Sequence, residues 1–150
     1  MALAFLPEQP SRAAEQFRIG NAEMLQALLS VRDDASAPWI DWMWGDTDPD
    51  VVSDPAMRAI LYSVLHEGLR QGPMGICWDN VAWVGAWGFE LSEVRRPVHL
   101  WCGEQDQMAP LVNVEWLSDH LPDTALTVCA GEGHLVPMRH WEDILRTVTS

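Results

Sequence analysis

The sequence predicts an α/β fold in which a helical first part is followed by a strand–helix–strand–helix unit. Two short apolar runs, at 98–102 and 125–129, have the length of buried strands, and a helical pattern at 110–121 separates them. Strands that are joined through a helix in this way form a parallel crossover unit. We therefore expect a helical region over residues 1–90 and an α/β segment over residues 91–150.

Helical patterns in the first part are interrupted by an acidic stretch. Residues 11–31 carry apolar side chains at helical spacing, with Ser11 as the N-cap. The stretch 33–54 holds seven Asp and no basic residue, which favours a solvated acidic loop. Its segment Asp46-Thr-Asp48-Pro-Asp50 resembles the start of a calcium loop, but the turn glycine and the bidentate glutamate of that loop have no counterpart, so calcium binding is not expected.

The clearest helix is predicted at 55–70, where Asp54 is the N-cap and Pro55 occupies the first helical position. The apolar segment 78–89 is expected to form a short helix and a loop. We expect its indole side chains to lie in the core, because Trp buries a large apolar area. These side chains are Trp78, Trp83 and Trp87. A last helix is predicted at 139–148 from its apolar spacing.

Charge and residue usage exclude several classes of function. The net charge is −13, so the chain lacks the basic footprint that nucleic acids and anionic membranes require. All nine basic residues are Arg, and the absence of Lys excludes Schiff-base chemistry and a Ser–Lys dyad. The longest uncharged apolar run, residues 81–89, is less than half of the ~20 residues of a membrane span. The first ten residues lack the positive charge of a signal peptide, so we expect a cytoplasmic protein.

Cysteine and histidine spacing gives no sign of a metal centre, and no metal or cofactor is expected. The three cysteines are widely spaced without a C-x-x-C pattern, which favours reduced thiols. Four histidines show no metal-ligand spacing such as H-x-x-x-H and are interpreted as structural, with the last of them a candidate for the rim of a site. They are His66, His99, His120 and His140.

Asp106 and His134 follow the two predicted strands. Asp106 lies four residues past the end of the first strand, and His134 lies five residues past the end of the second. Neighbouring parallel strands end at the same edge of a sheet, about 4.8 Å apart, so loops of this length can bring the two side chains together. An Asp that fixes the tautomer of a His, with that His as general base, provides two of the three members of a catalytic triad.

The segment PVHLWCGEQDQMAP…HLPDTALTVCAGEGHLVP resembles the C-terminal end of an α/β-hydrolase. In that family the penultimate strand is followed by G-x-x-D-x-x-x-P, and the last strand is followed by G-H. The matching residues here are Gly103, Asp106, Pro110, Gly133 and His134. The resemblance covers about residues 87–148. It implies a partial α/β-hydrolase fold, with a cap-like helical region before a C-terminal core segment, and a catalytic role for Asp106 and His134 in a Ser-Asp-His triad.

The nucleophile of this family has no counterpart in the sequence. The family places it on G-x-S-x-G before the cap, and none of the eight Ser residues is flanked by Gly at both positions. The oxyanion-hole loop and most strands of the family's sheet belong to the same missing part. Relatives that use Asp in place of Ser carry it on the same element, so the type of nucleophile stays open. Cys102 and Cys129 lie in predicted strands and are expected to be buried, inert thiols.

Two functions from different classes remain. The first is a hydrolase of an ester, amide or related bond that acts on a small hydrophobic or aromatic substrate and is inactive without its nucleophile part. The second is a non-catalytic binding or interaction module derived from a hydrolase. A two-stranded parallel sheet is not stable by itself and exposes a strand edge. The expected partners are therefore the missing N-terminal half or a second copy of the chain.

Overall fold

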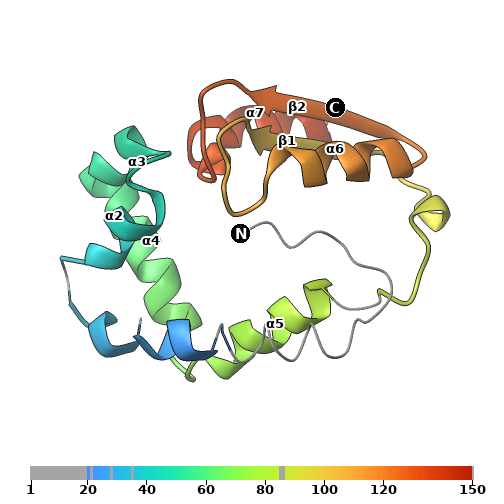
Figure 1. The fold of residues 1–150 in the computed structure, drawn as a ribbon. Coiled ribbons are helices and arrows are strands. Elements are labelled where there is room, and N and C mark those ends of the chain that lie inside the picture. Colours follow the sequence, from blue (N-terminus) through green and yellow to red (C-terminus); the bar gives the residue numbers. More distant parts are fainter. Residues whose placement is uncertain (1–19, 21, 28, 35, 85–86, 150) are drawn as a thin grey trace.

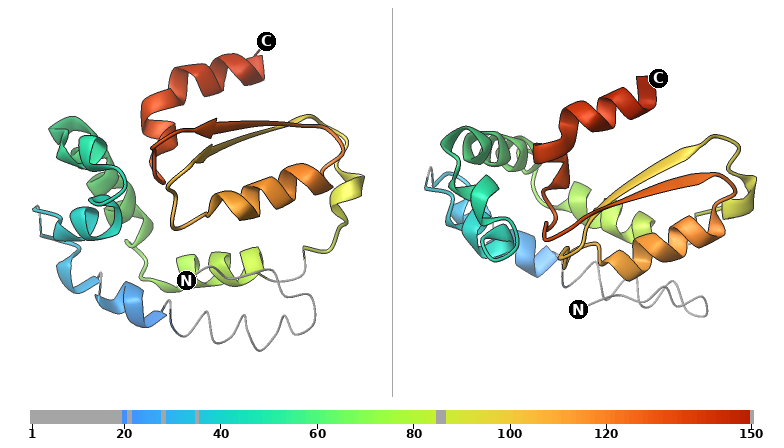
Figure 2. Two further views of the ribbon diagram at one scale, coloured as in Figure 1. Left: turned by 45° about the horizontal axis from the view of Figure 1, so that its top comes forward. Right: turned by 90° about the horizontal axis from the view of Figure 1, so that it is seen from above.

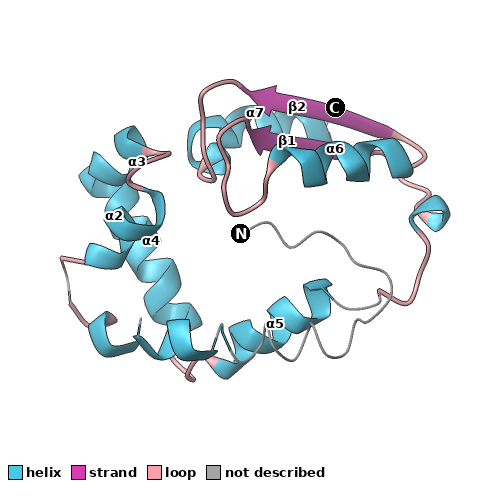
Figure 3. Ribbon diagram, in the orientation of Figure 1, coloured by secondary structure: helices cyan, strands magenta, loops and turns pink. Residues whose placement is uncertain are grey.

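The chain folds into a helical region followed by a small α/β unit (Figure 1). The structure is a computed structural model that describes residues 20, 22–27, 29–34, 36–84 and 87–149. Of the helix predicted at 11–31, residues 20, 22–27 and 29–31 are helical, whereas the proposed N-cap Ser11 lies outside the described residues. The strands are confined to the C-terminal part of the described chain (Figure 3).

Two short helices replace the solvated loop that was predicted at 33–54. They are α2 (Pro38–Trp44) and α3 (Pro49–Ser53). Each begins at a proline, whose fixed φ suits the first helical turn. Each also buries two apolar side chains, which in α3 are Val51 and Val52. The prediction was wrong because the many Asp residues obscured two apolar faces that are each less than two turns long.

The next helices follow the sequence pattern more closely. They are α4 (Pro55–Gly68) and α5 (Met74–Val84). The Asp54 carboxylate accepts hydrogen bonds from the backbone N–H groups of Ala56 and Met57, which confirms the predicted N-cap of α4. In α5, Cys77 is fully buried whereas Trp78 is 57% exposed, so the expectation that Trp78 lies in the core was wrong. Adjacent helical residues point about 100° apart, so Trp78 can face solvent while Cys77 faces the core.

The main core lies where α2, α3 and α4 meet. Arg58 of α4 fastens this region: its guanidinium pairs with Asp41 and donates hydrogen bonds to the carbonyls of Ser36, Ala37 and Val52. The buried apolar cluster also takes in one residue from the far end of the chain, so the core joins the helical region to the C-terminal part. Its members are Leu25, Ala37, Trp39, Ile40, Val51, Val52, Leu61, Leu69, Cys77 and Leu135.

A short 3-10 helix, η1 (Leu91–Glu93), leads into the α/β unit. The unit consists of β1 (Val98–Gly103), α6 (Leu111–His120), β2 (Thr124–Cys129) and α7 (Val136–Thr149). The strands are parallel, with Val98 opposite Thr124 and Gly103 opposite Cys129, which confirms the predicted crossover unit. The helices α6 and α7 lie on opposite sides of the two strands (Figure 2). Both strands are one residue longer than predicted, and α7 begins three residues earlier.

Two further sequence predictions are tested by this fold. Cys102 and Cys129 are both buried free thiols, as expected for residues at the ends of neighbouring strands. Trp87 is half-buried and stacks on Phe89, while the Trp83 side chain lies outside the described part of the structure. Among the described residues, no helix has both the length and the apolar character needed to cross a membrane.

Candidate active site

The loop after β1 holds the Asp106 carboxylate in a fixed orientation. Its Oδ1 accepts hydrogen bonds from the backbone N–H groups of Met108 (2.8 Å) and Ala109 (2.9 Å). Its Oδ2 lies 2.9 Å from Nδ1 of His134, in the loop after β2. The Asp106 side chain is only 7% exposed, whereas His134 remains 37% exposed. The parallel crossover therefore brings together the two residues that the sequence singled out, with the carboxylate inside and the imidazole accessible.

Two glycines let the loops after β1 and β2 pack this closely. A Cβ atom on Gly103 would collide with the backbone of Glu132 and Gly133. A Cβ on Gly133 would collide with the side chains of Thr47 and Asp48, in the segment between α2 and α3. Gly103 is thus required by the close approach of another backbone segment, and Gly133 is required by the side chains of the helical region. Both are among the glycines of the sequence motifs.

Each member of the Asp106–His134 pair favours the charged form of the other. Burial alone would raise the pKa of Asp106, but the hydrogen bonds from His134, Ala109 and Met108 bring it below the ordinary value of 3.8. The hydrogen bond to Asp106 raises the pKa of His134 above 6.5, against the opposing effect of burial. The raised His134 pKa contributes stability that is complete below 6.5 and is lost as pH rises through the folded value. The lowered Asp106 pKa contributes stability above 3.8 that is lost as pH falls through its folded value.

The helical region contributes an aromatic side chain beside this pair. The Trp44 ring, at the end of α2, lies almost parallel to the His134 ring, with 8° between planes and 6.4 Å between centroids. Its Nε1–H group points to the sulfur of Met108, 3.3 Å away, in the loop that carries Asp106. Trp44 therefore lies beside both loops and forms an apolar wall next to the imidazole.

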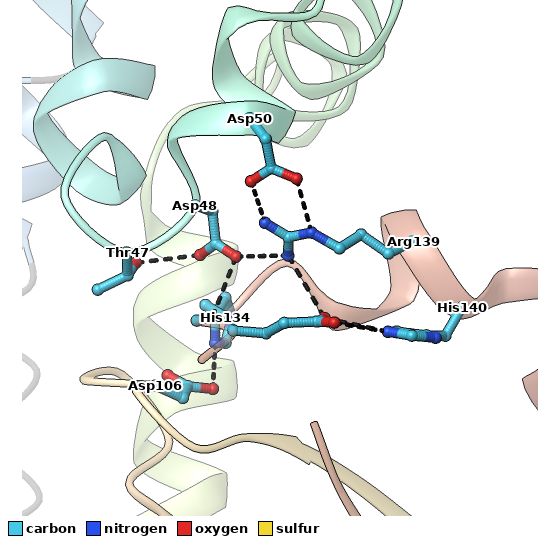
Figure 4. A network of polar contacts seen from close by, with 9 residues as sticks. Thr47, Asp48, Asp50, Asp106, His134, Arg139 and His140 are labelled. Atoms are coloured by element: carbon cyan, nitrogen blue, oxygen red, sulfur yellow. Dashed lines mark hydrogen bonds and ion pairs between the residues drawn. The ribbon is translucent and has the colours of Figure 1, made fainter. Parts of the chain in front are cut away.

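A buried ion-pair network ties the helical region to the histidine loop (Figure 4). Asp48 is fully buried, and its Oδ1 accepts hydrogen bonds from Arg139 Nη1 (2.7 Å) and from the backbone N–H of Gly133 (3.2 Å). Its Oδ2 accepts the Thr47 hydroxyl at 3.0 Å. Arg139 also forms a two-pronged pair with the Asp50 carboxylate. The acidic segment thus binds a guanidinium from α7, which the sequence prediction of a solvated loop did not anticipate.

The network continues from Arg139 through Glu132, 3.6 Å away, to His140 (Figure 4). His140 Nε2 is 2.9 and 3.1 Å from the two carboxylate oxygens of Glu132, and the Cys129 thiol lies close to both side chains. His140 therefore pairs with Glu132, and its place at the rim of the site stays a prediction. Residue spacing did not predict this cluster because its members come from a strand, a loop and a helix. A C-x-x-E pattern at the end of a strand was the one available signal, and it is weak.

The imidazole of His134 is expected to titrate above 6.5, because protonation at this site is favoured by the Asp106 carboxylate. NMR titration of the histidine ring protons measures this pKa directly. Asp106→Asn removes the negative charge and should shift the His134 midpoint to lower pH. Asp119→Asn alters an exposed carboxylate on α6 and serves as the control. A His134 midpoint at or below 6.5, or one that both variants move equally, would contradict the pairing.

The comparisons with known proteins point to the class of α/β-hydrolases. No family model matches the chain. Over 57 residues the chain is 40% identical to the pimeloyl-(acyl-carrier protein) methyl ester esterase of Aromatoleum aromaticum, a protein of that class. The match takes in 38% of this chain and 23% of the esterase, so the chain corresponds to less than a quarter of the relative's length. This similarity supports a partial relationship to the α/β-hydrolases.

Proposed function

We propose that this chain supplies the acid and the histidine of an α/β-hydrolase that cleaves an ester, amide or related bond. The observation that carries the proposal is the 2.9 Å contact between Asp106 Oδ2 and His134 Nδ1 at the carboxyl edge of a parallel sheet. In this arrangement Nδ1–H donates to the carboxylate, which leaves Nε2 as the base that takes the proton of a nucleophile. The protonated imidazole then gives that proton to the leaving group.

The proposed reaction requires a nucleophile from another part of a hydrolase, because the sequence holds no G-x-S-x-G pattern. Within the described residues β1 pairs with β2 alone, so its second edge is free to accept a further strand. An N-terminal part that adds a parallel strand at this edge would continue the sheet and bring its own carboxyl-edge loops toward His134. Without that part, the free edge is a site for self-association.

The residues around His134 favour a small hydrophobic or aromatic substrate. Trp44 provides an apolar surface parallel to the imidazole, and Met108 extends it on the Asp106 side. The relative from Aromatoleum aromaticum is named for the hydrolysis of a methyl ester. A small carboxylic ester is therefore the first substrate to test.

A chimera tests the proposal. Residues 36–150 of this chain, which include Trp44 and Asp48 beside the histidine loop, replace the corresponding segment of the Aromatoleum esterase, which keeps its nucleophile part. We expect this chimera to hydrolyse small activated esters, and we expect turnover to disappear with His134→Ala because the general base is lost. Hydrolysis is followed as release of the alcohol.

The control for the chimera is His120→Ala, which removes an exposed imidazole at the end of α6 and should leave turnover unchanged. A folded chimera with no turnover would reject the proposal, and so would turnover that survives His134→Ala. Circular dichroism establishes that each variant is folded before its rate is compared.

A second candidate function is supported by the exposed aromatic side chains of the helical region. Trp42 is 68% exposed and Trp78 is 57% exposed, which is unusual for residues of this size. A binding module derived from a hydrolase would use such surfaces to hold a partner or an apolar ligand. Saturable binding of a small ester by the whole chain, together with an inactive chimera, would favour this function over catalysis.

A further inference from the structure

We propose that Cys129, Glu132 and His140 form a binding site for Zn²⁺. Each residue offers one ligand atom, namely a sulfur, a carboxylate oxygen and an imidazole nitrogen, and these atoms all lie within 4.8 Å of one another. Thiolate and imidazole are the ligands that favour zinc over calcium or magnesium, which prefer shells of oxygen atoms. The site is separate from the Asp106–His134 pair and does not depend on hydrolase activity.

The distances suit a tetrahedral ion after small side-chain movements. With ordinary Zn–N, Zn–O and Zn–S bonds, neighbouring ligand atoms are about 3.3–3.6 Å apart. The distances from His140 Nε2 to the two carboxylate oxygens of Glu132 are 2.9 and 3.1 Å. An ion that replaces this hydrogen bond therefore requires the two side chains to separate only slightly. The Cys129 sulfur would have to approach the other two by no more than about 1.3 Å.

The three ligands are held by different elements that converge at one point. Cys129 is the last residue of β2, and Glu132 lies in the loop that follows. His140 stands in α7 at the one position where the helix departs from helical geometry, with φ −113° and ψ 16°. Its ring also packs against Trp101 of β1, at 5.8 Å between centroids. Strand, loop and helix thus approach the same point from three directions, which is what a compact coordination site needs.

The local charge favours a cation in spite of the nearby arginine. Arg139 Nη1 lies 3.6 Å from Glu132, but the same guanidinium pairs with Asp48 and Asp50. Three carboxylates therefore face one guanidinium, which leaves two negative charges uncompensated. A divalent ion at Cys129, Glu132 and His140 would offset this excess together with the charge of the Cys129 thiolate, leaving one negative charge.

The burial of the ligands leaves room for a water molecule as the fourth ligand. Cys129 is buried, whereas Glu132 and His140 are 21% and 28% exposed, so solvent reaches part of the site. Three protein ligands and one open position are typical of zinc sites that bind water or a small ligand. A bound ion would also fix the loop between Glu132 and His134 and so restrict the movement of the His134 side chain.

The test measures metal binding by the whole chain, freed of metal with a chelator and then dialysed against Zn²⁺. We expect one Zn²⁺ per chain, and we expect Co²⁺ in its place to show a thiolate-to-metal charge-transfer band. Cys129→Ser should abolish that band, and both Cys129→Ser and His140→Ala should weaken Zn²⁺ binding at least about tenfold. Glu132→Gln should weaken it as well while its amide oxygen keeps the contact with His140.

Cys102→Ser is the matched control, because Cys102 is also buried and lies at the end of the neighbouring strand. It should leave both the stoichiometry and the cobalt band unchanged. Less than one bound Zn²⁺ per chain, a cobalt spectrum without the thiolate band, or equal binding by the Cys129→Ser and Cys102→Ser variants would overturn the proposal. Circular dichroism shows whether each variant retains its helices. If His140→Ala does not retain them, the Zn²⁺ affinity of the Glu132→Gln variant is used instead.

Discussion

Asp106→Asn is expected to lower the turnover number of the chimeric hydrolase by about 10⁴-fold and to leave its folding unchanged. The asparagine oxygen can still accept the hydrogen bonds from Met108 and Ala109, so the loop keeps its shape. Its amide NH₂ group, however, then faces Nδ1 of His134 at the place of Oδ2. The imidazole must offer a lone pair there and carry its proton on Nε2, where it can no longer accept the proton of a nucleophile.

The Asp106→Asn variant also distinguishes two roles of the carboxylate, which are to fix the tautomer of His134 and to raise its pKa. Because the neutral imidazole of the Asp106→Asn variant is in the wrong tautomer, raising the pH should not restore turnover. In the unaltered chimera, by contrast, turnover should increase as pH rises through the raised pKa of His134, since the base acts in its neutral form. Rates are measured as kcat and kcat/KM between pH 5 and 10. An Asp106→Asn chimera that keeps a tenth or more of the rate would exclude Asp106 as the orienting acid, and Asp119→Asn is its control.

The parallel unit and its Asp106–His134 contact could be anticipated from sequence because each step rests on a local signal. The apolar runs at 98–102 and 125–129 are bounded by Pro97, Gly103 and Pro122, and a helical pattern lies between them. Such a unit has one favoured handedness and one carboxyl edge, so residues that follow the two strands at similar distances must meet there. The crossover rule was the only long-range rule needed to predict that Asp106 and His134 lie close together.

The attachment of the helical region could not be anticipated in the same way. Asp48 and Arg139 are 91 residues apart, and nothing local to either indicates the other. The acidic stretch has a composition typical of a solvated segment, and only its burial against α7 reveals Asp48 as a core residue. The cluster of Cys129, Glu132 and His140 was not predicted for a related reason, because the spacing of its residues fits no single helix or strand. Contacts between elements depend on packing, which periodicity within each element does not encode.

Asp48→Ala is expected to lower the free energy of unfolding by about 3 kcal/mol, because removal of one partner of a buried ion pair leaves the other uncompensated. Gly133, which is itself buried, also loses the acceptor of its backbone N–H. The value lies at the lower end of the range for buried pairs because Arg139 is 19% exposed and still has Asp50 to contact. Urea titration followed by tryptophan fluorescence gives the free energy of unfolding.

Asp50→Ala is the matched control, because Asp50 pairs with the same guanidinium from a side chain that is 66% exposed. An exposed pair contributes little, so this variant should lose less than about 1 kcal/mol. The double variant Asp48→Ala, Arg139→Ala should lose less than the sum of the two single losses, since the second change removes the charge that the first left unpaired. Equal losses for Asp48→Ala and Asp50→Ala would mean that burial does not govern the strength of this network.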